Sequence, residues 1–157
     1  QRGNCRLVGE TIAAAHRIGV DELSFLAADV SSTAFNRPEP WPADRQDEIA
    51  VPAAELDALG RAIDQAVATD AQSFSSGFVV GGVASLRRIH DYYAAVAGLA
   101  PFPPVRCNAP WVSAVLEPGG TLRPCFFHPP YADRDGSLAA TLATSRVPAP
   151  VMPLRLT

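Results

Sequence analysis

The chain has 157 residues, of which 48% are hydrophobic and 18% charged, with a formal net charge of −3. This composition favours a packed core over wholesale disorder, and the slight acidity argues against nucleic acid as the main partner. No apolar run approaches the ~20 residues of a membrane-spanning helix, and we expect no signal peptide. Three widely spaced cysteines are not typical of a secreted disulfide scaffold. We therefore expect a cytoplasmic protein with reduced thiols.

Helical and strand-like patterns alternate through the first hundred residues. Apolar spacing predicts helices over Gly9–Ile18, Pro52–Thr69 and Val83–Leu99, and Gly19 stands where a C-terminal cap belongs. Short apolar runs predict strands at Glu22–Ala27 and Phe78–Val80. This order is typical of α/β units, in which helices cover parallel strands.

The segment Ala28–Ala50 lies between the first predicted strand and the second predicted helix. Loops longer than about 12–15 residues without secondary structure are usually lids, binding loops or disordered. Phe35, Arg37 and Trp41 argue against plain disorder. The segment follows the carboxyl end of a strand, where α/β folds place ligands, so we predict a lid or binding loop.

A β-hairpin is predicted after a proline-rich joint at residues 100–106. The strands are Val112–Leu116 and Thr121–Phe127, and Pro118–Gly120 supplies the turn between them. Cys107 precedes the first strand and Cys125 lies near the end of the second, so the hairpin can bring the two thiols together. The spacing alone leaves three alternatives: two unrelated buried cysteines, a disulfide, or two ligands of zinc or of an iron–sulfur cluster.

The histidines are weaker candidates. We expect His16, beside Arg17 in the first predicted helix, to pack rather than to bind a metal, and His90 to shield the core. His128, three residues after Cys125, could be a metal ligand, but we expect it rather to hydrogen-bond a metal-binding residue or to make a turn contact. No Ser-His-Asp set or phosphate-binding loop is predicted.

The cysteine spacing resembles a known family pattern. Twelve residues separate Cys107 from Gly120, and four separate Gly120 from Cys125. This spacing is similar to the start of the SPASM/Twitch auxiliary-cluster domain of radical S-adenosylmethionine (SAM) enzymes. The run APWVSAVLEPGGTLRPCFFHPP resembles the family's P-x-x-S-x-x-x-x-x-x-G-x-x-x-P-C, and Gly136-Ser137-Leu138 resembles the helix start that follows it. Upstream, AHRIGVDELSFLAADVSSTAFNRP is similar to the last part of the radical SAM barrel. The resemblance extends to about residue 146.

The resemblance implies a fold of two parts within the α/β class. Residues 1–100 would be the C-terminal part of a partial (β/α) barrel. Residues 101–157 would be a truncated SPASM/Twitch-like domain of a β-hairpin and a short helix at Ser137–Ser145.

The resemblance also implies site residues. Cys107 and Cys125 would be thiolate ligands of an auxiliary 4Fe–4S cluster. Arg2 and Asn4, at a strand end, would contact SAM, and Asp29, at the same edge, would hydrogen-bond SAM or substrate. The alternatives are that Arg2 and Asn4 form a polar strand end capping the next helix, and that Asp29 accepts backbone amides of its own loop.

Two departures from the family limit the expected activity. The Cys-x3-Cys-x2-Cys motif that holds the SAM-cleaving cluster is absent, and no cysteine follows Arg146 to complete an auxiliary site. We therefore expect a segment that is not catalytic alone. Its parent enzyme would act on a small molecule or a peptide, with a possible redox partner protein and without nucleic acid or membrane. The alternative from another class is a non-catalytic α/β binding module with a structural zinc or no metal.

Overall fold

The computed structural model describes residues 1–34, 37, 39–104, 112–117, 121–128 and 130. These residues belong to two compact units, which we describe separately. The first unit comprises Gln1–Ser31 and Trp41–Pro103, and the second comprises Ser32–Pro40 and Pro104–Thr157.

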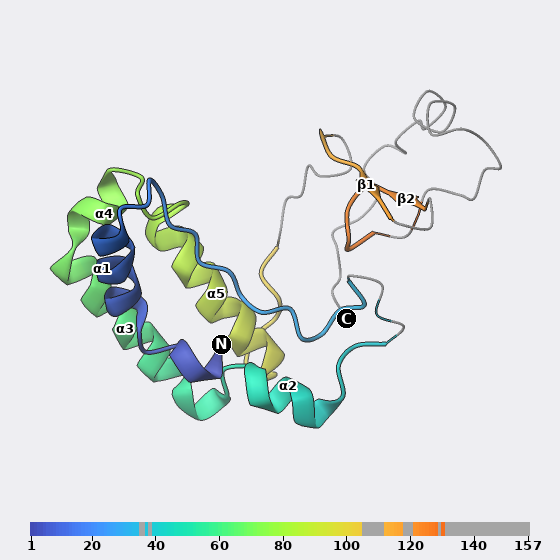
Figure 1. Ribbon diagram of the computed structural model, residues 1–157. Coiled ribbons are helices and arrows are strands. Elements are labelled where there is room, and N and C mark those ends of the chain that lie inside the picture. Colours follow the sequence, from blue (N-terminus) through green and yellow to red (C-terminus); the bar gives the residue numbers. More distant parts are fainter. Residues whose placement is uncertain (35–36, 38, 105–111, 118–120, 129, 131–157) are drawn as a thin grey trace. The chain divides into compact units, whose positions relative to one another are not determined.

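The first unit is built from helices (Figure 1). In chain order they are η1 (Arg2–Asn4, a 3-10 turn), α1 (Val8–Ile18), α2 (Ala43–Ile49), η2 (Ala53–Glu55, a 3-10 turn), α3 (Leu56–Thr69), α4 (Ala71–Ser75) and α5 (Gly82–Val96). The three predicted helices are confirmed as α1, α3 and α5, with shifted ends. Among the described residues, no helix is long and apolar enough to cross a membrane.

Helix α3 contacts both α1 and α5 (Figure 1). Its buried residues Leu56, Leu59, Ile63 and Ala66 recur at helical spacing, so they form one apolar stripe. Ile63 is fully buried in the same core cluster as Tyr93 of α5. The packing of this stripe joins α1 and α5 in one hydrophobic core.

Replacing Ile63 by alanine should therefore destabilise the protein strongly. We expect the Ile63→Ala variant to lose about 2–5 kcal/mol of unfolding free energy, because a cavity replaces a buried side chain. Urea denaturation measures the loss, and Arg61→Ala on the exposed side of α3 is the control. Equal midpoints for the two variants would contradict this description of the core.

The two predicted strands meet at one parallel β-bridge, Leu23↔Val79. The Leu23 N–H donates to the Phe78 carbonyl at 2.8 Å, and the Val80 N–H donates to the Leu23 carbonyl at 2.9 Å. The pairing is thus parallel, as predicted, but much shorter than expected. Gly77 and Gly81, both with positive φ, turn the chain away on either side of Val79, so the pairing cannot continue.

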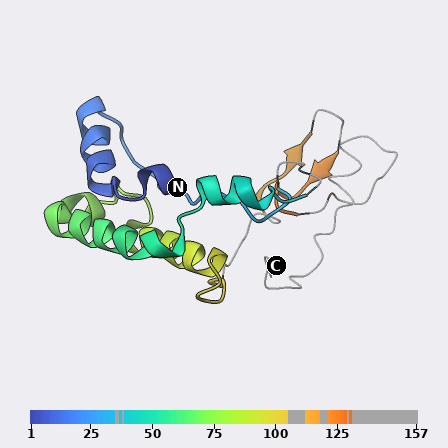
Figure 2. The same ribbon diagram turned by 90° about the horizontal axis from the view of Figure 1, so that it is seen from below.

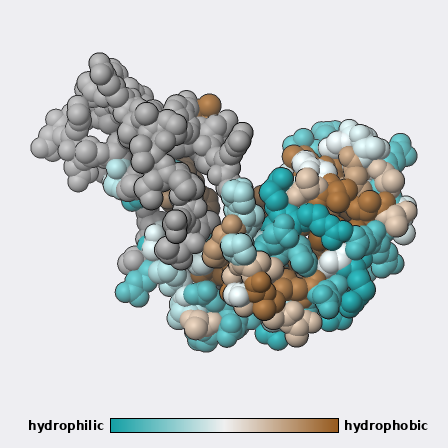
Figure 3. Space-filling model, turned by 180° about the vertical axis from the view of Figure 1, so that it is seen from behind, coloured by the Kyte–Doolittle hydropathy of each residue, from teal (hydrophilic) through white to brown (hydrophobic). Residues whose placement is uncertain are grey.

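Beyond this bridge, the predicted strand Glu22–Ala27 is an extended segment. Leu23 and Phe25 pack against the core, whereas Leu26 is 85% exposed. Other large apolar side chains also reach the surface, and Figure 3 shows apolar areas among polar ones on one face. The pattern of this segment therefore predicted its extended conformation but not its partial burial.

The loop predicted over Ala28–Ala50 is wrong in its second half, where α2 forms. Pro42 stands at the N-cap of α2, and Asp44 lies in its first turn. The Gln46 side chain donates to the Trp41 carbonyl at 2.6 Å, and Arg45 pairs with Glu48 one turn later. Short helices of this kind depend on local contacts that an apolar pattern does not reveal.

The second unit contains the antiparallel pair β1 (Val115–Leu116) and β2 (Leu122–Arg123), with Leu116 opposite Leu122. The predicted hairpin pairing is confirmed, although the strands are shorter than expected. Its turn at residues 118–120 and the predicted helix Ser137–Ser145 lie outside the described residues. In the part of the chain that the structure describes, helices and one small antiparallel sheet give the coarse α/β class.

Candidate functional site

The predicted metal ligand Cys125 lies two residues beyond β2, is half-buried, and carries a free thiol. Cys107 lies outside the described residues, so the approach of the two thiols stays a prediction. Within the described part of the chain, no three His, Cys, Asp or Glu side chains are grouped to hold a metal ion.

Polar contacts hold the backbone around Cys125. The Ser113 hydroxyl donates to the Pro124 carbonyl at 2.9 Å, and the His128 N–H donates to the Cys125 carbonyl at 3.3 Å. The Arg123 guanidinium bonds both Glu117 and the His128 carbonyl. His128 therefore makes the turn contact expected of it, and Cys125 sits in a turn fixed from both strands.

Arg2 and Asn4 lie in η1, a 3-10 turn, and not at the end of a strand. Leu7 is the N-cap residue of α1, so neither residue caps that helix. The Arg2 Nη1 donates to the Asp47 carbonyl at 3.2 Å and its Nε lies 3.9 Å from the Glu55 carboxylate. Arg2 thus connects η1 with two later segments of the chain.

Asp29 lies on a segment that two tyrosines of α5 hold in place. The Ala28 N–H donates to the Tyr93 hydroxyl at 3.0 Å, and the Val30 N–H donates to the Tyr92 hydroxyl at 3.4 Å. Burial raises the pKa of Tyr93 above its ordinary value, so its hydroxyl stays neutral. The backbone on both sides of Asp29 is therefore held by hydrogen bonds from α5. The other two predicted SAM-contact residues, Arg2 and Asn4, lie on a different element, η1.

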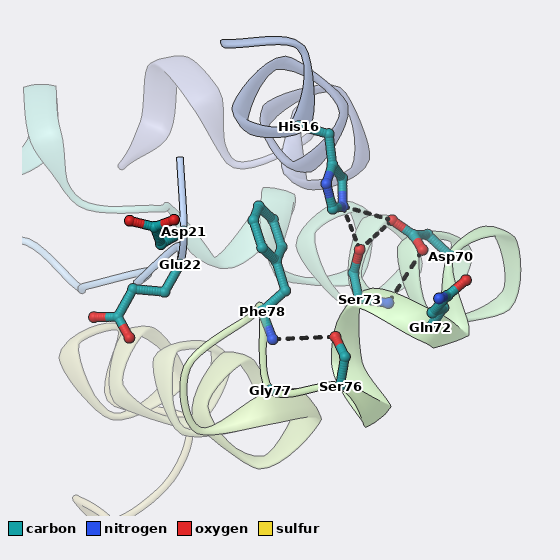
Figure 4. Close-up of a pocket in the computed structure, with 9 residues that line it drawn as sticks. All are labelled: His16, Asp21, Glu22, Asp70, Gln72, Ser73, Ser76, Gly77 and Phe78. Atoms are coloured by element: carbon teal, nitrogen blue, oxygen red, sulfur yellow. Dashed lines mark hydrogen bonds and ion pairs between the residues drawn. The ribbon is translucent and has the colours of Figure 1, made fainter. Parts of the chain in front are cut away.

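A polar cluster that the sequence did not predict lies beside a cavity of about 510 Å³ (Figure 4). It joins His16 at the end of α1 with Asp70 and Ser73 at the start of α4. The His16 Nε2 lies 2.6 Å from the Ser73 hydroxyl and 3.7 Å from the Asp70 carboxylate. The His16 ring stacks on Phe78 with 4.0 Å between ring centroids.

The proton positions in this cluster follow from donor chemistry. An ionised carboxylate only accepts, so the Ser73 hydroxyl donates to Asp70 at 2.5 Å. That hydroxyl must then accept from His16, which assigns a proton to the His16 Nε2. Asp70 also accepts the Ser73 backbone N–H at 3.2 Å and so caps α4. The hydrogen bond from the Ser73 hydroxyl lowers the pKa of Asp70 most. The bond from the Ser73 backbone N–H and, to a lesser extent, the nearby His16 lower this pKa further.

This arrangement differs from a Ser-His-Asp catalytic triad. In a triad the histidine takes the serine proton and the carboxylate bonds the other ring nitrogen. Here the Ser73 hydroxyl donates its hydrogen bond to Asp70, and Asp70 faces the same His16 nitrogen, Nε2, as Ser73 does. Ser73 is also only 3% exposed. The cluster therefore ties α1 to α4, and His16 packs as predicted. Asp70-Ala-Gln-Ser73 carries the spacing of a helix N-cap, which is the one signal in the sequence for it.

Comparisons of the chain with protein-family models, with curated proteins and with solved structures found no match. No family is shown. A function can therefore be inferred only from the residues themselves and from the resemblance of their spacing.

Removing the Ser73 hydroxyl should loosen the link between α1 and α4. We expect Ser73→Ala to lose about 0.5–1.5 kcal/mol of unfolding free energy, because the bonds of the Ser73 hydroxyl are lost while water can still reach His16 and Asp70. Ser75→Ala is the matched control, since that hydroxyl is exposed and bonds only within α4. The same unfolding midpoint for both variants in urea would show that the cluster does not stabilise the fold.

The lowered pKa of Asp70 predicts a loss of stability in acid. Because its folded pKa lies below the ordinary value of 3.8, its contribution is present above that value. The contribution is lost as the pH falls through the folded pKa. Between about pH 5 and about pH 2.5, we expect Asp70→Asn to lose less unfolding free energy than the wild type. Asp57→Asn, at an exposed position of α3, should follow the wild-type curve; parallel curves for all three proteins would contradict the prediction.

Proposed function

We propose that this chain is the C-terminal segment of a radical SAM enzyme. Residues 1–100 would form part of its (β/α) barrel. Residues 101–157 would form a SPASM/Twitch-like domain that supplies Cys107 and Cys125 to an auxiliary 4Fe–4S cluster. The observation that carries the proposal is the spacing of Cys107, Gly120 and Cys125 around the β1–β2 hairpin.

The surroundings of Cys125 suit a cluster ligand. Iron–sulfur clusters are held by cysteine thiolates, and hydrogen bonds and solvent exposure near the sulfurs tune their potential. Cys125 is half-buried, with a free thiol, in a turn that Ser113 and His128 brace. A fixed backbone of this kind would hold the sulfur in one position while leaving it accessible to iron.

The order of elements in the first unit is compatible with the proposed barrel segment, although its parallel pairing is a single bridge. Leu23 follows α1, Val79 follows α3 and α4, and α5 follows Val79. The Leu23↔Val79 bridge is parallel, and a parallel pair with helices in the connection is the unit from which (β/α) barrels are made. Asp29 follows the first of these segments, and in a barrel it would lie near the edge where such folds bind ligands.

The proposed roles of the site residues come from the family resemblance. Asp29 would hydrogen-bond SAM or a small-molecule or peptide substrate, and Arg2 and Asn4 would contact SAM from η1. A bound auxiliary cluster would relay electrons or anchor the substrate, with a redox partner protein as electron donor. The chain lacks Cys-x3-Cys-x2-Cys, so these residues would bind and orient ligands without cleaving SAM themselves.

Iron binding by the hairpin cysteines tests the proposal. We expect the chain, reconstituted anaerobically with iron, sulfide and a small thiol that fills the remaining iron positions, to retain iron and sulfide. Cys107→Ala and Cys125→Ala should each abolish retention, because two protein thiolates are the minimum anchor available here. Cys5→Ala is the control, since Cys5 is buried in the first unit. Retention that survives loss of either hairpin cysteine would refute the ligand assignment.

The second candidate is a non-catalytic α/β binding module. The bond between the His128 N–H and the Cys125 carbonyl brings a histidine close to a cysteine, and zinc accepts both ligand types. A colourless protein that contains zinc and no iron would favour this candidate. A reading frame upstream of the gene segment that lacks Cys-x3-Cys-x2-Cys would exclude the radical SAM assignment.

A further inference from the structure

Arg2 stands where η1, α2 and η2 meet. Its Nη1 donates to the Asp47 carbonyl in the last turn of α2, and its Nε faces the Glu55 carboxylate in η2. Figures 1 and 2 both show the N-terminus beside the end of α2 that leads toward α3. One side chain at the start of the chain thus reaches a helix more than forty positions later.

Helix α2 has few stabilising features within its own residues. It has seven residues, none of them buried, and no side chain caps its N-terminus. A helix of this length is marginal in water without tertiary contacts. Trp41 before the helix and Ile49 at its end are partly buried against the core, and Ala50 directly after it is buried in the core. The order of α2 therefore depends on a small number of contacts at its ends.

The contact from Arg2 is placed where a helix gains most from it. The last four carbonyls of a helix have no partner within the helix, and the Asp47 carbonyl is one of these four. A positive charge near the carboxyl end also interacts favourably with the helix dipole. Arg2 supplies both the hydrogen bond and the charge from outside the helix.

Glu55 keeps Arg2 in position for this contact. Its carboxylate also faces Arg6 at 3.5 Å and accepts from the Cys5 thiol at 3.6 Å. Burial, followed by the bond to Glu55, raises the pKa of Cys5, so Cys5 remains a protonated donor. Arg2 and Arg6 thus share one carboxylate, but of these two only Arg2 is bonded to α2 among the described contacts.

We propose that residues 41–50 form a strap, held closed on the first unit by Arg2, which opens locally while α1, α3 and α5 stay folded. The inference goes beyond the proposed function and does not require any cluster or ligand. It assigns Arg2 a conformational role, because its bond to the Asp47 carbonyl ties η1 to a helix that has no buried residue of its own.

Amide hydrogen exchange of the whole chain, followed by mass spectrometry, tests the strap. In the wild type we expect α2 amides to exchange faster than those of α3. Arg2→Gln should speed exchange in residues 41–50 by about fivefold, the effect of one net hydrogen bond, without changing α1, α3 or α5. Arg2→Lys, which keeps the charge and a donor, should give a smaller increase.

Arg6→Gln is the matched control, because it removes a neighbouring arginine that shares Glu55 but is not the donor to Asp47. It should leave exchange in residues 41–50 unchanged. Three results would overturn the proposal: no change in Arg2→Gln, an equal change in Arg6→Gln, or faster exchange in all helices together, which would indicate global destabilisation.

Discussion

The burial of one face of α3 between α1 and α5 is the constraint on which the first unit depends. Leu59 and Ile63 sit at the centre of that contact, and Tyr93 of α5 is fully buried in the same core cluster. Because the helices are fixed in this way, the segments that connect them are brought to defined positions. The parallel contact of Leu23 with Val79 is one result, since each residue follows a helix of this core.

Polar contacts hold two segments to the core helices: the start of α4 and the backbone around Asp29. His16, Ser73 and Asp70 tie the end of α1 to the start of α4, close to the bridge at Val79. Tyr92 and Tyr93 hold the backbone that carries Asp29. In both places a side chain on a long helix satisfies a group on a short or irregular segment.

The sequence predicted those parts of the fold that depend on repeating patterns. The apolar stripe of α3 and the turn residues before Thr121 were sufficient for the long helices and the hairpin pairing. They were not sufficient for α2 and α4, which are too short to show a stripe. The His16–Ser73 contact could not be predicted either, because packing joins residues that are 57 positions apart. The cysteine pair remains a prediction, because Cys107 lies outside the described residues.

A short thiol-to-thiol crosslinker tests the proposal that the hairpin brings the sulfurs of Cys107 and Cys125 together. The reduced protein should form an internal crosslink between Cys107 and Cys125, identified by peptide mapping, with Cys5 unmodified in the core. The opposite result would be that both hairpin thiols react separately with single-thiol reagents while no crosslinked peptide forms. In that case the two sulfurs would be too far apart to share a cluster, and the family assignment would lose its structural basis.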